Sequence, residues 1–157
     1  MMDINVWDVL TGYVDGAFCS VSVELMSTGF RRCDQHQWGP DRRFAVIIGF
    51  VGAFKGRVMV SADAPTTAAV TESMNFGEVV ESLEEQCLYL AEFTNMFAGK
   101  IVTLLNNAFR GSDLRLTPPV MFSAVNLDVQ TPTMRAAAYY FEGNSGCITM
   151  EIGIEGV

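Results

Sequence analysis

A glutamate and an asparagine three residues apart, Glu92 and Asn95, are the residues of this sequence whose types and spacing best suit chemistry. On a helix, residues three apart lie on the same face. There the amide can both donate and accept hydrogen bonds, and the carboxylate can pair with a cation. The apolar Leu88 and Met96 lie on this face, one turn to either side of Glu92, with Gly99 beyond them. The combination favours a surface on which another protein docks, although a solvated face rich in glutamate remains the open alternative.

The other reactive or metal-binding side chains form no recognisable motif. Cys19, Cys33, Cys87 and Cys147 include no Cys-x-x-Cys pair and no zinc-like spacing, so we expect free thiols, with Cys87 packed on an apolar helix face. His36 is the one histidine and lies in a polar stretch, so any metal site or Ser-His-Asp triad would have to use it. We therefore predict that the chain itself holds no metal and no cofactor.

A long helix over residues 79–108 is predicted to position the Glu92–Asn95 pair. At about 100° per residue, apolar side chains gather on one side of residues 81–108, and this side is predicted to face the core. The core face comprises Leu83, Cys87, Leu90, Thr94, Phe97, Ile101, Leu104, Leu105 and Ala108. The polar face comprises Glu81, Glu84, Glu85, Glu92, Asn95, Thr103 and Asn106. On the polar face we expect Glu85, Leu88, Met96 and Gly99 to contact a partner, although a glycine in mid-helix costs about 1 kcal/mol relative to alanine.

The remaining sequence predicts a first helix, several strands and a second, shorter helix. Asp63 and Pro65 mark the start of the short helix, over residues 66–75. Gly49, Gly52 and Gly56 match no phosphate-binding motif and are expected in a hairpin or bulge. The other expected elements are a helix over 4–17 capped by Asp3, a strand over 18–28, a polar loop over 29–43, two strands within 44–63, an extended stretch over 114–128 broken at its prolines, and a hairpin with arms 134–142 and 147–155.

This order of elements predicts an α+β fold, in which an antiparallel sheet of about six strands carries long helices. Each half of the chain begins with a helix and ends in a hairpin, which fits an internal duplication. With 157 residues, half of them hydrophobic, we expect residues 1–157 to form a single domain with a sizeable core.

The charge of the chain argues against two classes of partner. The formal net charge is −8 and the isoelectric point is about 4.5, which opposes binding to nucleic acid or to an anionic membrane surface. The only dense basic cluster, Arg31, Arg32, Arg42 and Arg43, contains acidic residues within it. The sequence shows no signal peptide and no stretch long enough to span a membrane, so we expect a cytoplasmic protein.

Residues 90–102, LAEFTNMFAGKIV, resemble the active-site helix of the CheC/CheX/FliY chemotaxis phosphatases. Glu92 and Asn95 match the family's Glu-x-x-Asn motif, and Pro118 lies where that motif has its proline. The segment over 47–74 also resembles the family's strand–glycine–strand–helix segment, and the whole resemblance spans roughly residues 44–155. Leu88 departs from the pattern, because the family has aspartate or serine there. The first helix carries no Glu-x-x-Asn, so the chain resembles the single-site CheX branch.

The resemblance implies a phosphatase that hydrolyses the aspartyl phosphate of a CheY-like response regulator in chemotaxis or two-component signalling. Asn95 would orient the attacking water, Glu92 would pair with a lysine of the regulator, and the Mg²⁺ would belong to the regulator. The resemblance also implies a homodimer, for which the long final strand is predicted to be an uncovered sheet edge. Two alternatives stay open: a non-catalytic docking module of the same fold that binds a response regulator or chemotaxis protein, and a structural or dimerisation domain such as a flagellar-switch relative.

Overall fold

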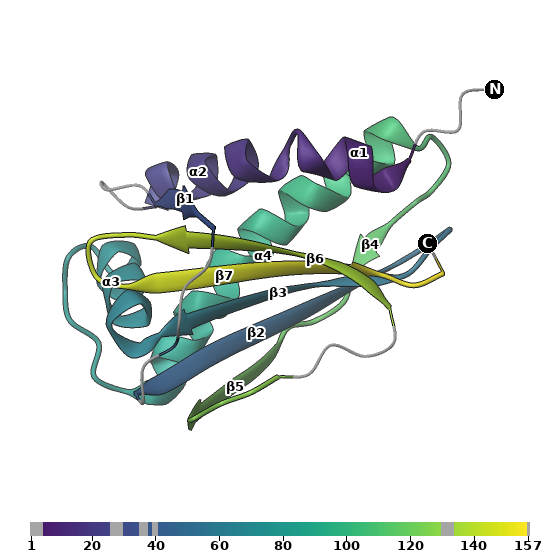
Figure 1. Cartoon of the computed structure of the whole chain (residues 1–157). Helices are drawn as coiled ribbons and strands as arrows, with labels where there is room; N and C mark the ends of the chain where they lie inside the picture. The colour runs from purple at the N-terminus through teal and green to yellow at the C-terminus, as the bar shows by residue number, and fades with distance from the viewer. Residues whose placement is uncertain (1–4, 26–29, 35–37, 39–40, 130–133, 157) are drawn as a thin grey trace.

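An antiparallel sheet carries the helices on one of its faces in the computed structural model of this chain (Figure 1). The structure describes residues 5–25, 30–34, 38, 41–129 and 134–156. The helices are α1 (Val6–Thr11), α2 (Val14–Leu25), α3 (Ala64–Met74) and α4 (Leu83–Ala108). The strands are β1 (Arg31–Cys33), β2 (Arg42–Val51), β3 (Gly56–Asp63), β4 (Arg115–Leu116), β5 (Val120–Val125), β6 (Arg135–Glu142) and β7 (Cys147–Ile154).

The strand order is symmetric about the boundary between β3 and β7. The sheet runs β1-β6-β7-β3-β2-β4, and β5 also pairs with β2. Two hairpins, β2–β3 and β6–β7, therefore form the centre of the sheet, and each is flanked by a strand from the other half of the chain. This is the arrangement that an internal duplication would produce. The predicted α+β fold is confirmed, with seven strands among the described residues where about six were expected.

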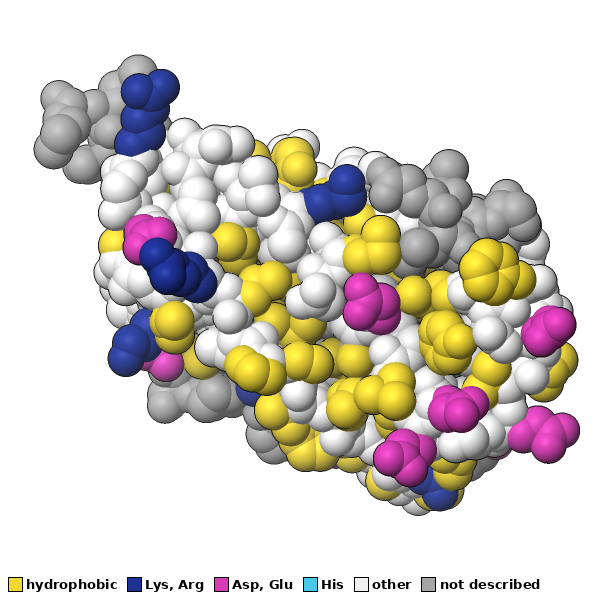
Figure 2. Space-filling view, turned by 180° about the vertical axis from the view of Figure 1, so that it is seen from behind, with side chains coloured by type: hydrophobic (Ala, Val, Ile, Leu, Met, Phe, Trp, Pro, Cys, Tyr) yellow, Lys and Arg dark blue, Asp and Glu magenta, His cyan; other side chains and the backbone are white. Residues whose placement is uncertain are grey.

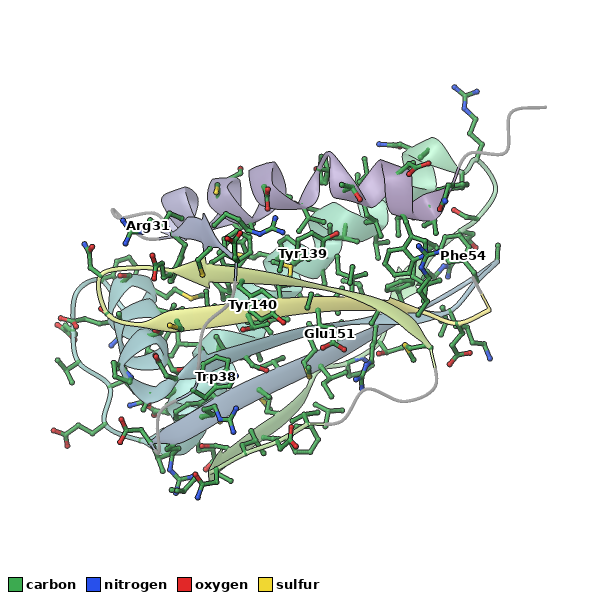
Figure 3. All side chains as sticks on the ribbon, viewed as in Figure 1. Arg31, Trp38, Phe54, Tyr139, Tyr140 and Glu151 are labelled. Atoms are coloured by element: carbon green, nitrogen blue, oxygen red, sulfur yellow. The ribbon has the colours of Figure 1, made fainter. Side chains whose placement is uncertain are left out.

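The core lies between the sheet and the helices. The β7 side chains Ile148, Met150, Ile152 and Ile154 alternate along the strand and are fully buried, as expected for a strand with one face on the core. Alternation places the next side chains on the opposite face of the sheet, which no described helix covers. Figure 3 shows Tyr140 of β6 and Glu151 of β7 on that open face.

Gly49, Gly52 and Gly56 lie in or between β2 and β3, which form the expected hairpin, and Gly56 at the start of β3 has a packing role. A Cβ atom on Gly56 would lie 2.3 Å from the ring of Phe50 and 2.4 Å from the carbonyl oxygen of Gly153. The two strands and β7 approach too closely there for any side chain, so this glycine serves the sheet and not a phosphate group.

The strand predicted over residues 18–28 is wrong, because residues up to Leu25 belong to helix α2. Alternating valine and serine suggested a period of two. The buried residues instead follow helical spacing, with Val14, Phe18, Val21 and Ser22 all fully buried. Ser22 satisfies its hydroxyl inside the helix by donating to the Phe18 carbonyl at 3.0 Å. A short segment of small β-branched and polar residues fits both periods, and the tertiary packing decides between them.

The N-terminal helix also differs in detail from the prediction. The predicted helix over residues 4–17 is divided between α1 and the start of α2, because α1 ends at Thr11, with Gly12 as its C-cap, and α2 begins at Val14. The cap of α1 is Asn5, whose side chain accepts from the Trp7 amide at 2.9 Å, in place of the predicted Asp3, which lies outside the described residues. The predicted loop over 29–43 contains β1 and the start of β2.

The prediction that the final strand is a sheet edge is wrong. β7 pairs with β6 on one side and with β3 on the other. Its length and regular apolar pattern are the properties of an interior strand, since exposed edges are usually short or charged. The outermost strands of the described sheet are β1 on one side and β4 and β5 on the other.

Candidate functional site

Helix α4 carries the predicted site, and its start is defined by the sequence. Ser82 caps the helix by accepting from the Glu85 amide at 3.3 Å, and Glu84 and Glu85 lie in the first turn, where negative charge is favoured. The helix therefore begins at Leu83, a few residues later than the helical pattern suggested. Leu83 was placed on the core face, but it is 46 % exposed, because this first turn extends beyond the core.

Aromatic packing fixes the rotation of α4 about its axis. Phe93 and Phe97 are fully buried and meet the ring of Phe18 edge to face, with centroid distances of 5.7 and 6.0 Å. Phe18 in turn stacks on Phe141 of β6 at 4.0 Å. Such contacts hold the helix in one orientation. The predicted rotation is confirmed, since Ile101 is also fully buried.

This rotation directs Glu92 and Asn95 away from the core, and both side chains are exposed. Leu88, one turn before Glu92, is 55 % exposed. A Cβ atom added at Gly99 would meet no atom within 4 Å, so the helix surface is open at that position. Met96 differs from the expectation in part, because it is half-buried and packs against the core.

An open groove of about 720 Å³ lies beside Glu92. Glu85, Leu88 and Glu92 of α4 line one side of it, and the chain that leaves α3 lines the other. The two sides are joined by a hydrogen bond from the Tyr89 hydroxyl to Asn75 Oδ1 at 3.0 Å. The groove residues that the sequence analysis did not identify are Met74, Asn75, Val80 and Tyr89. No pattern along the sequence predicts that Asn75 and Tyr89 meet.

Asn106 and Pro118 are not among the residues that line this groove. Asn106 has a structural role at the end of α4: its Oδ1 accepts from the Leu114 amide at 2.8 Å and the Ser112 hydroxyl at 2.9 Å. Its Nδ2 donates to the Leu114 carbonyl at 3.0 Å. Pro118 is exposed in the connection between β4 and β5.

Cys33, Cys87 and Cys147 each have a pKa raised above the ordinary value of a thiol, which favours the protonated form at neutral pH. Burial raises the pKa of Cys87, with Glu84 adding to the rise and Arg42 opposing it. Burial also raises the pKa of Cys33 and of Cys147. A raised thiol pKa disfavours nucleophilic attack. No cluster of three potential metal ligands occurs among the residues that the structure describes, and His36 lies outside them.

The chemistry of this surface requires a second molecule. Glu92 and Asn95 can hold a cation and a water molecule, but both are open to solvent, where such interactions are weak. Catalysis by positioned polar groups needs a site from which bulk water is excluded. A partner that covered this helix face would supply that exclusion and whatever reacting group the site acts on.

The sequence matches the family described as "Chemotaxis phosphatase CheX" over residues 44–142, which is more than half of the chain. The chain belongs to the CheX family. None of the curated proteins matches its sequence. Within the described part of the chain, none of the helices combines the length and the apolar character needed to cross a membrane.

Several solved structures share the CheX fold of this chain at low sequence identity. A chemotaxis protein CheX from Vibrio vulnificus is 20% identical with a TM-score of 0.80, covering 98% of this chain and 100% of that one. CheX from Desulfovibrio desulfuricans is 16% identical with a TM-score of 0.79, covering 94% and 99%. A CheX–CheY–BeF3–Mg²⁺ complex from Borrelia burgdorferi contains a similar chain, 21% identical with a TM-score of 0.77, covering 97% and 99%.

Proposed function

We propose that this chain hydrolyses the aspartyl phosphate of a CheY-like response regulator in chemotaxis or two-component signalling. The observation that carries the proposal is the outward Glu92–Asn95 pair on a rigidly packed helix, in a chain of the CheX family. The Borrelia relative, a CheX bound to CheY with BeF3 and Mg²⁺, supports a response regulator as the partner.

Asn95 is assigned the positioning of the attacking water. Its amide oxygen accepts a hydrogen bond from the water and its amide nitrogen donates one, which orients the water in line with the phosphorus without a strong base. The water oxygen bonds to phosphorus as the bond from phosphorus to the aspartate oxygen breaks. The aspartate carboxylate leaves with the electron pair, and inorganic phosphate is released. The catalytic effect comes from positioning, so this chain need supply no nucleophile.

Glu92 is assigned the docking of the regulator. Its carboxylate is exposed one turn from Leu88, where it can pair with a lysine beside the phosphoaspartate. The charged pair becomes desolvated when the two proteins meet, and it fixes the register that brings Asn95 to the phosphorus. The Mg²⁺ of the reaction is assigned to the regulator, and no cofactor is assigned to this chain.

Leu88 favours a second candidate function, a non-catalytic docking module that binds a response regulator or chemotaxis protein. It stands where the family has aspartate or serine, and its side chain is 55 % exposed beside Glu92. Release of inorganic phosphate separates the two functions. The phosphatase proposal predicts that the chain accelerates phosphate release from a phosphorylated regulator, such as one encoded beside its gene. Tight binding to several phosphorylated regulators without faster release would establish the docking module instead.

A homodimer is part of the proposal, and strand β5 is assigned as the sheet edge through which the two copies pair. Val120, Phe122 and Val125 of this outer strand are 52 %, 41 % and 56 % exposed, and an uncovered apolar strand invites pairing with another copy. Light scattering at high micromolar concentration is expected to give the mass of two chains. A mass of one chain would contradict the dimer and leave the phosphatase proposal intact.

A further inference from the structure

The connection between α3 and α4, residues 75–82, exposes two large apolar side chains to solvent. Phe76 is 97 % exposed and Val79 is 73 % exposed. Leu83 and Leu88 of α4, between this connection and Glu92 along the chain, are also exposed, at 46 % and 55 %. Large exposed apolar side chains mark sites of interaction with other molecules when they gather on one surface. We refer to Phe76 and Val79 as the apolar ridge.

Phe76 also breaks a local rule of helix termination. It follows the C-cap of α3, and the Gly77 amide donates to the Glu72 carbonyl at 2.8 Å, as in a Schellman motif. That motif places the residue after the cap in the left-handed region, which normally belongs to glycine, and Phe76 has φ 58° there. A bulky side chain in this conformation is strained. The chain therefore holds an aromatic ring in solvent at a position where glycine would be relaxed.

The apolar ridge is held in place before any partner arrives. The Gln86 side chain donates to the Val80 carbonyl at 2.8 Å, and the Asn75 side chain donates to the Glu78 carbonyl at 3.2 Å. With the Tyr89–Asn75 hydrogen bond, these contacts tie the connection to α4. A surface ordered in advance loses less conformational entropy on binding. The groove beside Glu92 includes Asn75 and Val80, so the ridge adjoins the candidate site.

The charge around the apolar ridge identifies the chemistry of its partner. Between Arg57 and Lys100 the sequence contains no lysine or arginine. The acidic residues of the same interval are Asp63, Glu72, Glu78, Glu81, Glu84, Glu85 and Glu92. Figure 2 shows acidic side chains gathered among apolar ones at the end of this face where α3 lies. Arg42 of β2 acts on Cys87 of α4 and lowers the pKa of that thiol, but acidic side chains outnumber it in this interval, so electrostatic complementarity favours a basic partner surface.

We propose that the apolar ridge inserts into an apolar depression bordered by lysine or arginine on the response regulator, beside its phosphorylation site. The inference rests on the proposed function and adds a second contact to it, one that selects the regulator without touching the reacting atoms. Phe76 and Val79 add affinity for the regulator to that supplied by Glu92, and Asn95 sets the rate of hydrolysis.

Phe76→Gly is the variant that isolates this role, because it removes the ring and relieves the backbone strain together. We expect its thermal stability to equal or exceed that of the wild type, while KM for the phosphorylated regulator rises about tenfold and kcat stays within about twofold, as for loss of an interface contact. If Phe76 had only a structural role, any rise in KM would be accompanied by a loss of thermal stability. Val51→Ser is the matched control: Val51 is 44 % exposed at the end of β2 far from α3, and its loss should leave KM unchanged.

The affinity of the same variants for the regulator loaded with beryllium fluoride and Mg²⁺ is measured as well. This second measurement separates an error in the role of the ridge from an error in the proposed phosphatase function. A wild type that releases phosphate, with unchanged KM in Phe76→Gly, would overturn the ridge alone. A wild type that binds without releasing phosphate would overturn the phosphatase, and the dissociation constants of the variants would then decide the ridge. A Phe76→Gly chain that has changed its oligomeric state would show that the ridge contacts a second copy of this chain, and would overturn the assignment to the regulator.

Discussion

Helices α2 and α4 both lie on the covered face of the sheet (Figure 1), and they differ in what they present to solvent. Each packs buried aromatic or aliphatic side chains against the strands, with Phe18 in α2 and Phe97 in α4 in mutual contact. Outward, α2 presents Asp15, which forms an ion pair with Arg32 of β1. In contrast, α4 presents Glu92 and Asn95. The fold therefore positions two helices, and the outward side chains decide which one can act on a partner.

The largest effects are expected where the two helices are alike, in the core. Phe18→Ala and Phe97→Ala should each lower the free energy of unfolding by about 3–5 kcal/mol, because each leaves a cavity in the shared aromatic cluster. Denaturant unfolding monitored by circular dichroism measures both. A loss below about 1 kcal/mol in either variant would show that the two helices do not share one packed core.

Glu92→Ala tests the docking role assigned to α4. We expect binding to the phosphorylated regulator to weaken by roughly thirtyfold, since truncating one partner of a buried charge pair costs about 2 kcal/mol or more. Turnover should fall as well, because the register of docking is lost. Isothermal titration with the beryllium fluoride–Mg²⁺ form of the regulator gives the affinity. Unchanged affinity would remove Glu92 from the interface.

Leu88→Asp restores at this position a residue type that the related phosphatases carry. If the chain is a working phosphatase, phosphate release should stay equal or rise by a few-fold, measured at a saturating regulator concentration. Leu88 is exposed, so the effect on stability should stay within about 0.5 kcal/mol. A tenfold rise in KM for the phosphorylated regulator would show that this side chain is itself an apolar docking contact.

Asp15→Ala should have the smallest effect and provides the control on α2. The Asp15–Arg32 pair has side chains that are 53% and 44% exposed, so its loss should cost between about 0 and 1 kcal/mol of stability. Phosphate release should be unchanged. A decrease in phosphate release, with the fold intact, would mean that α2 also takes part in the reaction and that the comparison between the helices fails.

The sequence predicts some parts of this molecule well for physical reasons. Helix α4 is long enough for its apolar residues to repeat over many turns, which makes its rotation predictable from spacing alone. The β6–β7 hairpin follows from local alternation around a glycine-containing turn, and Gly143 and Gly146 close it with a 2.9 Å backbone hydrogen bond. Glu92 and Asn95 were accordingly predicted to be exposed on one face, and they are.

Other parts depend on contacts between distant segments and were missed. The neighbours of β7 include β3, a pairing of strands from opposite halves that no local pattern encodes. The groove beside Glu92 depends on Asn75 meeting Tyr89 after the chain has turned between α3 and α4. Phe76 was overlooked because its two unusual properties, a positive φ and an exposed ring, are visible only in three dimensions.

The kinetics of the Asn95→Ala variant test the central claim most directly. The change removes the water-orienting amide but leaves the docking surface, and alanine is the better helix former, so stability should barely change. We predict that phosphate release at saturating phosphorylated regulator falls by about a hundredfold or more, as for loss of one precisely placed polar group, while the dissociation constant stays within about twofold. Unchanged phosphate release from Asn95→Ala would contradict the account, because this face of α4 would then not be the catalytic site.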